Sequence, residues 1–198
     1  ATANVGIDLG IATFAAFSDG VLHPPLNAYR AHAVKKACMQ RRLAGMVKYS
    51  QNWKKQQHRI ARLDIRIANC RHDFLHKLST ETSKNHAVIG IENLQVRNMS
   101  RSARGTVDEP GRTVAAKSGL NKAILDQGWG TFRRMLEYKQ LWRGGEVIAV
   151  PPRYTSQECP TCHHICKENR PQQALFLCVA CGYTNHADVV GAININTL

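Results

Sequence analysis

Long hydrophobic runs are absent from this chain, and so is any segment with the composition of a secretory signal peptide. No apolar stretch approaches the about 20 residues that a membrane-spanning helix needs. The sequence also holds no internal repeat and no low-complexity segment. We therefore expect a protein without a membrane partner that works in the reducing cytoplasm. An initiator Met is missing too, which suggests a piece of a longer chain.

Acidic residues are scarce relative to basic ones. The 198 residues include 27 Lys and Arg against 14 Asp and Glu, which gives a formal charge of +13 and a pI near 9.8. Such an imbalance predicts a polyanionic partner, and nucleic acid is the commonest one. The hydrophobic content of 43% suffices for one sizeable core and a small additional module.

Four of the seven cysteines form two Cys-x-x-Cys pairs, Cys159/Cys162 and Cys178/Cys181, with fifteen residues between the pairs. This spacing is typical of a four-cysteine zinc ribbon. Each pair places two thiolates on one tight turn, so two pairs can close a tetrahedron around a single Zn²⁺ that keeps no open position. We predict a structural zinc ion, and the chemistry must then lie elsewhere.

Two alternatives to this ligand set exist. The four cysteines could form two disulfides, although a chain without a secretory leader disfavours disulfides. His163, His164 and Cys166 lie beside the first pair and could substitute as ligands. Because both Cys pairs are intact, we favour the four-cysteine site.

The remaining pattern predicts an α/β fold built on one mixed sheet. Strands are expected within 5–17, with a hairpin turn at 18–20, over 86–94, and over 146–150. Helical spacing indicates two helices between about 29 and 78, joined near 48–52, and another over 121–143 whose apolar stripe includes Leu125 and Trp142. Between them, 95–120 is predicted to be a long loop. Cys38 and Cys70 are expected to be buried thiols.

The predicted helices of 29–80 carry basic residues with few acids among them. Charged residues on a helix usually form a face exposed to solvent, but a mixture of acidic and basic residues would give the same solubility. A face of one sign favours contact with phosphates. The residues expected to contact nucleic acid lie on the second helix: Lys54, Lys55, Arg59, Arg62 and Arg66.

Three carboxylates stand beside apolar segments, where an unpaired charge is costly. Asp8 lies inside the first strand, Glu92 ends the second, and Asp188 precedes the last apolar run. Structural roles would be a turn cap for Asp8, a salt bridge for Glu92 and a helix N-cap for Asp188. If the three met, they could not all stay ionised without cations, and Mg²⁺ or Mn²⁺ takes such oxygen ligands.

Two such ions, about 3.5 to 4 Å apart, would suit phosphodiester hydrolysis. One would activate a water, and the other would stabilise the leaving oxygen. This hypothesis fails if one of the acids lies far from the others or is buried against an arginine.

Three sequence motifs, GIDLG, IGIENL and ADVVGAININ, together with the interposed CPTC and CVAC pairs, closely resemble the split motifs of the nuclease domain of the TnpB family. These transposon-encoded proteins are relatives of the type V CRISPR effectors. The resemblance implies an RNase H-like (RuvC-like) mixed sheet flanked by helices, with an inserted zinc ribbon. It matches Asp8, Glu92 and Asp188 with the catalytic metal ligands, and places Asn93 where the family often has Asp.

The resemblance also implies the partners. The family cuts DNA under the direction of a guide RNA, and an N-terminal part that precedes the first catalytic strand recognises the RNA scaffold. We therefore expect a monomeric, nucleoid-associated endonuclease with a nuclease core over 1–154, a zinc ribbon over 155–183, and the last catalytic motif and helix over 184–198. The alternatives are a module that binds RNA and DNA without cutting, and a transposase domain that joins strands.

Overall fold

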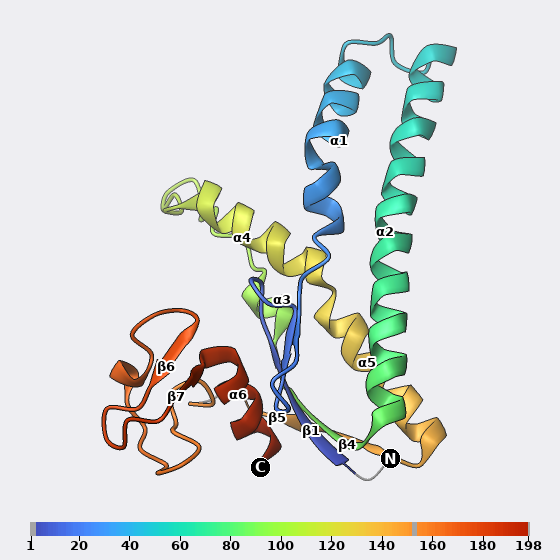
Figure 1. Ribbon diagram of the computed structural model, residues 1–198. Helices are drawn as coiled ribbons and strands as arrows, with labels where there is room; N and C mark the ends of the chain where they lie inside the picture. Colours follow the sequence, from blue (N-terminus) through green and yellow to red (C-terminus); the bar gives the residue numbers. More distant parts are fainter. Residues whose placement is uncertain (1–2, 152–153, 198) are drawn as a thin grey trace.

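A five-stranded mixed sheet forms the centre of the computed structural model, which describes residues 3–151 and 154–197 (Figure 1). Its strands are β1 (Ala3–Leu9), β2 (Ala15–Phe17), β3 (Leu22–His23), β4 (His86–Glu92) and β5 (Glu146–Val150), in the order β3-β2-β1-β4-β5. Strands β1, β4 and β5 are parallel, whereas β2 and β3 are antiparallel to their neighbours. The fold is thus mixed α/β, and residues 1–2, 152–153 and 198 of the predicted domains lie outside the described residues.

The first three strands form two successive hairpins. The predicted turn at 18–20 joins β2 to β3, with the Gly20 N–H donating to the Phe17 carbonyl over 2.9 Å. A second turn over 10–14 joins β1 to β2, where the Gly10 N–H donates to the Phe14 carbonyl over 3.3 Å. The alternating pattern of the sequence continues through residues 10–14, so this turn was not predicted.

Two long helices form a hairpin that projects away from the sheet (Figure 1). Helix α1 (Ala28–Ala44) and helix α2 (Gln51–Asn85) confirm the predicted pair, although α2 continues beyond the expected end near Leu78. The Ser50 hydroxyl caps α2 by accepting from the Trp53 N–H over 3.2 Å. Lys36 and Asp64 join the two helices through a 2.6 Å ion pair.

Two predictions about the helices were wrong in part. The expected loop 95–120 contains α3 (Val96–Met99) and the beginning of α4 (Val114–Gln127). The helix expected over 121–143 is divided at Gly128, whose φ of 76° ends α4 before α5 (Trp129–Arg143) begins. Leu125 of α4 and Trp142 near the end of α5 are exposed instead of buried.

The prediction that Cys38 and Cys70 are buried was also wrong, since both thiols are exposed. Helices α1 and α2 pack mainly against each other along much of the hairpin, so their outer faces are exposed to solvent.

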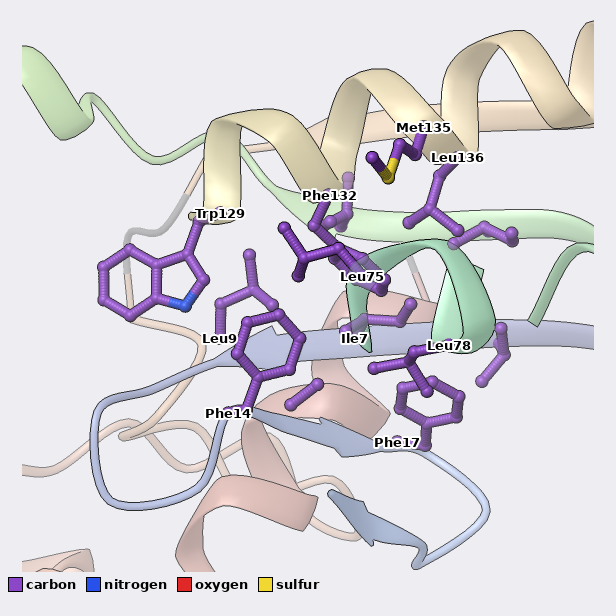
Figure 2. Packing of buried hydrophobic residues seen from close by; sticks show 14 of the residues in the cluster. Ile7, Leu9, Phe14, Phe17, Leu75, Leu78, Trp129, Phe132, Met135 and Leu136 are labelled. Atoms are coloured by element: carbon purple, nitrogen blue, oxygen red, sulfur yellow. The ribbon is translucent and has the colours of Figure 1, made fainter. Parts of the chain in front are cut away.

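The main core lies between the sheet and the helices α2 and α5. Side chains alternate along β1 and β4, so that Val5, Ile7 and Leu9, with Ile89 and Ile91, all point to this face. Figure 2 shows Ile7 and Leu9 of β1 beneath side chains from both helices. The helix residues in this layer include Leu75, Leu78, Phe132, Met135 and Leu136.

The opposite face of β1 and β4 presents glycine where a side chain would stand. Gly6 and Gly90 are register partners in the two strands, and helix α6 (Ala187–Asn196) lies directly on them. A Cβ at Gly6 would collide with the Ala192 carbonyl and lie 2.7 Å from the Asn196 nitrogen. The helix can therefore approach the sheet backbone only because both positions lack a side chain.

The chain between β5 and α6 forms a small lobe with the 3₁₀ helix η1 (Lys167–Asn169) and the hairpin β6 (Leu175–Leu177) and β7 (Thr184–His186). Cys159, Phe176 and Cys178 pack there against Val190 of α6. The Asn194 amide donates to the carbonyls of Thr155 and Glu158, each over 2.8 Å. The last helix thus holds both the sheet and this lobe. Over the described residues, no helix has the length and apolar character to cross a membrane.

We predict that Gly6→Ala lowers the free energy of unfolding by about 1–3 kcal/mol or more, because the new methyl group meets backbone atoms of α6. The matched control is Gly119→Ala in α4, where nothing lies near the added Cβ. That change should raise the free energy of unfolding by about 0.5–1 kcal/mol. Urea unfolding measures both, and equal effects of the two substitutions would contradict the close contact.

Candidate active site and metal centre

The sheet and α6 bring three carboxylates to one place. Asp8 and Glu92 each lie two residues after the paired glycines, so both side chains leave the same face at the carboxyl ends of parallel strands. Asp188 is the second residue of α6, whose axis begins beside these strand ends. The charges of Glu92 and Asp188 both act on Asp8. Glu92 and Asp188 therefore each lie within electrostatic range of Asp8, although the three carboxylates do not gather as closely as the four cysteines described below.

Asp8 and Glu92 both have raised pKa values and act on each other. Burial, followed by the charges of Glu92 and Asp188, raises the pKa of Asp8 to about 8. Burial also raises the pKa of Glu92, although hydrogen bonds from the Thr155 hydroxyl, over 3.3 Å, and from Asp8 oppose this rise. The positive charge of Arg170 opposes the rise at Asp8 without overcoming it, and a divalent ion would favour the charged form of both carboxylates.

Asp188 is paired with an arginine that the sequence analysis missed. One guanidinium nitrogen of Arg170 lies 3.1 Å from a carboxylate oxygen of Asp188, and the side chains are 27% and 19% exposed. Arg170 also donates from Nε to the Gln173 carbonyl over 3.1 Å. The pair is mostly withdrawn from solvent but keeps one partly exposed edge. No spacing pattern links these two residues, and only the folded lobe brings them together.

The contacts of the three acids differ from the structural roles expected for them. The N-cap of α6 is His186, whose Nδ1 accepts from the Asp188 N–H over 3.3 Å, so Asp188 is not the cap. No basic side chain in the described part of the chain forms an ion pair with Glu92. A Cβ at Gly191 would lie 2.9 Å from an Asp8 carboxylate oxygen, so this glycine leaves room for the acid.

Asn93, which stands where the resemblance leads one to expect an acid, is held by helix α5. Arg133 donates to the Asn93 side-chain oxygen over 2.8 Å and also pairs with Glu137 over 2.8 Å. The Asn93 N–H donates to the Val150 carbonyl over 2.8 Å. The residue after Glu92 thus fixes the end of β4 to α5 and β5.

The four predicted cysteines lie together in the lobe, and each of their sulfur atoms is within 4.8 Å of the others. Across the two pairs, Cys159 and Cys181 sulfurs are 3.6 Å apart, and those of Cys162 and Cys178 are 3.5 Å apart. A tetrahedron with zinc–sulfur bonds of about 2.3 Å has edges of about 3.8 Å. The cluster therefore fits one zinc ion. No other group of three or more Cys, His, Asp or Glu ligands gathers as tightly in the described parts of the chain.

Two of the three alternative ligands, His163 and Cys166, are engaged elsewhere. His163 lies 2.9 Å from a Glu158 carboxylate oxygen, and the Cys166 thiol donates to Glu168 over 2.7 Å. All four cysteines of the cluster are free thiols, so the disulfide alternative is not realised.

The electrostatics of the cluster also favour a cation. Burial opposes ionisation of Cys178, but N–H groups of Cys181 and Ala180 outweigh it and lower the pKa of this thiol to about 6. At Cys162 a backbone hydrogen bond at His164 favours the thiolate, yet burial and the other three sulfurs raise the pKa to about 12. Four thiolates cannot coexist here without a positive ion.

The predicted nucleic-acid contacts lie on α2, away from the carboxylates. Lys54, Lys55 and Arg59 are exposed near the tip of the hairpin, and Arg62 and Arg66 follow within two turns. Figure 1 places this tip at the far end of the molecule from α6. The structure does not bring these residues to the acids.

We predict one zinc per chain, and removing it should unfold the lobe of residues 155–183, because ligand binding in such small modules supplies folding free energy. Cys178→Ser should lose the metal, whereas Cys38→Ser, a change of an exposed thiol, should retain it. Metal analysis and limited proteolysis measure both effects. A zinc-free protein with an equally protected lobe would contradict the site.

The raised pKa of Asp8 predicts a pH-dependent stability. Between its ordinary pKa of 3.8 and about 8, Asp8 holds a proton in the folded chain that the unfolded chain has lost, so its contribution to stability falls as pH rises. In buffer free of Mg²⁺ and Mn²⁺, with zinc left in place, Asp8→Asn should therefore raise Tm increasingly over the wild type up to a pH of about 8. Asp19→Asn, in an exposed turn, is the control. A difference in Tm that does not change with pH would refute the raised pKa of Asp8.

Comparison with known proteins gives several matches. Residues 1–103 match the family model OrfB_IS605, described as "Probable transposase", and residues 129–195 match the model "Cas12f1-like, TNB domain". The chain is 58% identical over 191 residues to "Putative RNA-guided DNA endonuclease InsQ" of Escherichia coli (strain K12), covering 96% of the chain and 48% of that protein. A relative of the same description without a gene name, from Streptomyces pristinaespiralis, is 33% identical over 195 residues, covering 98% and 44%.

Among solved structures, a Cas12f1 complex with single-guide RNA and target DNA matches with a TM-score of 0.58 and 18% identity, covering 97% of this chain and 49% of the other. This likeness shows a shared fold. The chain spans about half the length of the curated relatives it matches. Since the OrfB_IS605 model covers more than half of its residues, the chain belongs to the TnpB family.

Proposed function

We propose that this chain is the nuclease portion of an RNA-guided DNA endonuclease that hydrolyses phosphodiester bonds with Mg²⁺ or Mn²⁺. The observation that carries the proposal is that the charges of Glu92 and Asp188 both act on Asp8, beside a glycine-lined contact with α6. Names of the relatives support the nuclease assignment, since both describe RNA-guided DNA endonucleases. The mixed sheet, with β1, β4 and β5 parallel, supports the RNase H-like arrangement.

The carboxylates would hold the catalytic cations, because oxygen ligands suit Mg²⁺ and Mn²⁺. Two bound ions would supply an activated water and a stabilised leaving oxygen. Metal binding would displace the proton that the raised pKa leaves on Asp8, and the Thr155 hydroxyl would keep Glu92 oriented. Gly191 would keep space open around Asp8.

Arg170 would orient Asp188 and add a positive charge at the edge of the acid cluster. Its guanidinium is fixed on one side by the Gln173 carbonyl and on the other by Asp188, so its position is set before any substrate arrives. A phosphate entering between Arg170 and the acids would meet a charge of the opposite sign.

The partners in this proposal are a DNA target and, with the additional part present in the longer relatives, a guide RNA. The match to a structure titled as a complex with single-guide RNA and target DNA supports RNA and DNA as the two classes of partner. Exposed basic residues of α2 would contact phosphates. We propose a monomer that acts at the cytoplasmic nucleoid.

Two other functions use the same fold. A module that binds RNA and DNA without cutting would not need a buried Asp8 under the charges of two further acids, so this arrangement favours the nuclease. A strand-joining transposase would use the same metal site but give transesterified products, whereas hydrolysis leaves 5′-phosphate ends.

The test is cleavage of supercoiled and single-stranded DNA in Mg²⁺ or Mn²⁺. Glu92→Gln and Asp188→Asn keep the size of each side chain but remove a metal ligand, so they should reduce cleavage by about a hundredfold or more. Asp108→Asn, in an exposed loop, should cleave like the wild type. Undiminished cleavage by either active-site variant would reject the assignment, and products joined to a second strand would favour the transposase.

A further inference from the structure

The tip of the α1–α2 hairpin has an unusual charge. Between Asp19 and Asp64 the sequence holds ten Lys or Arg residues and no acid. Within the described residues, these ten make one ion pair, Lys36 with Asp64, near the middle of the hairpin. The positive charge at the tip is therefore not neutralised by the protein itself, and it favours a polyanionic ligand.

A pocket of about 600 Å³ opens at this tip, where the end of α1 meets the beginning of α2. Arg42, Lys55 and Arg59 supply positive charge to its walls, and Ser50, Asn52 and Gln56 supply polar groups. The Gln56 amide is buried and donates to the Met39 carbonyl over 3.1 Å, so the floor of the pocket is fixed by both helices. The volume is within the range of sites that hold ligands of nucleotide size.

Aromatic side chains stand beside this pocket. Tyr49 and Trp53 contact each other with ring centroids 5.4 Å apart, and Tyr49 is 66% exposed. Tyr49 has a φ of 65° in the turn before α2, and the Lys48 ammonium lies 5.1 Å from its ring centre. An aromatic ring next to cations is the combination that binds unpaired bases, because a duplex already stacks its own bases.

The tip is distant from the acids. Helix α2 has 35 residues and is therefore about 50 Å long, and its base packs on the sheet that carries Asp8 and Glu92 (Figure 1). A DNA strand being cut must lie at the acids. A nucleic acid held at the tip can be a different molecule.

We propose that the hairpin tip is a docking site for unpaired RNA, with bases stacking on Tyr49 and Trp53 and phosphates entering the pocket of Arg42, Lys55 and Arg59. This assignment of RNA rests on the proposed function, in which the DNA occupies the acids and the RNA is the second nucleic acid. The site itself rests on the charge, the pocket and the aromatic pair.

The test measures binding of a short, unstructured, fluorescently labelled RNA by anisotropy, without Mg²⁺ or Mn²⁺, so that cleavage plays no part. The double substitution Tyr49→Ala/Trp53→Ala should weaken binding about tenfold, whereas Tyr49→Phe/Trp53→Phe should retain it, because phenylalanine still stacks. Retained affinity in the alanine variant, or equal loss in the phenylalanine variant, would overturn the stacking role.

Charge is tested separately with Arg42→Gln/Lys55→Gln/Arg59→Gln. Three lost phosphate contacts should make the slope of log affinity against log salt shallower by about 2, at about 0.7 for each contact with a single strand. The matched control, Lys77→Gln/Lys84→Gln/Arg143→Gln, removes equal charge from exposed positions near the other end of α2 and on α5. Equal effects of the two triple variants would overturn the tip as a site.

Competition identifies the nucleic acid. Unlabelled RNA of the same sequence should displace the label better than duplex DNA or single-stranded DNA of equal length. If either DNA competes better, the assignment to RNA is wrong. Because these outcomes do not depend on cleavage, an inactive but RNA-binding protein would refute the nuclease proposal and leave the docking site standing.

Discussion

The direct contact between helix α6 and the backbone of β1 and β4 is the constraint on which the rest of the structure depends. It exists because Gly6 and Gly90 are neighbours in register and neither carries a side chain. The same two-residue step that separates each glycine from an acid places Asp8 and Glu92 toward α6, while Ile7 and Ile91 point into the opposite core. One close packing arrangement therefore sets both the stability of the sheet and the position of the candidate site.

The metal-binding lobe contributes to this site as well as carrying its own zinc cluster. Thr155, where the lobe begins, donates to Glu92, and Arg170 within the lobe donates to Asp188. Asn194 of α6 holds the beginning of the lobe through the Thr155 and Glu158 carbonyls. Because zinc would fix the loops that carry these residues, a structural ion would influence the positions of carboxylates that it does not touch.

Features encoded by local spacing could be predicted from the sequence. The two Cys-x-x-Cys pairs, the long helices and the strands at 86–92 and 146–150 each follow from a short repeating pattern. The three acids could be singled out because a carboxylate in an apolar segment needs a partner. The need for glycine at positions 6 and 90, in contrast, becomes apparent only in the folded structure, where β1 pairs with β4 and α6 lies across them.

What the sequence did not reveal depends on contacts between distant segments. Arg170 is one of many basic residues until the lobe folds against Asp188. The division of α4 from α5 follows from the left-handed backbone of Gly128, and it places Leu125 and the buried residues of α5 on different helices. Cys38 and Cys70 resemble core thiols in sequence, but a projecting hairpin has outer faces that no other element covers.

A crystal of this chain soaked in Mn²⁺ would test the central claim most directly, because manganese can be located by its anomalous scattering. The account predicts a manganese peak ligated by Asp8, Glu92 and Asp188, with α6 still resting on Gly6 and Gly90. Manganese bound elsewhere, or bound by Asp8 and Glu92 while Asp188 stays with Arg170 alone, would contradict it.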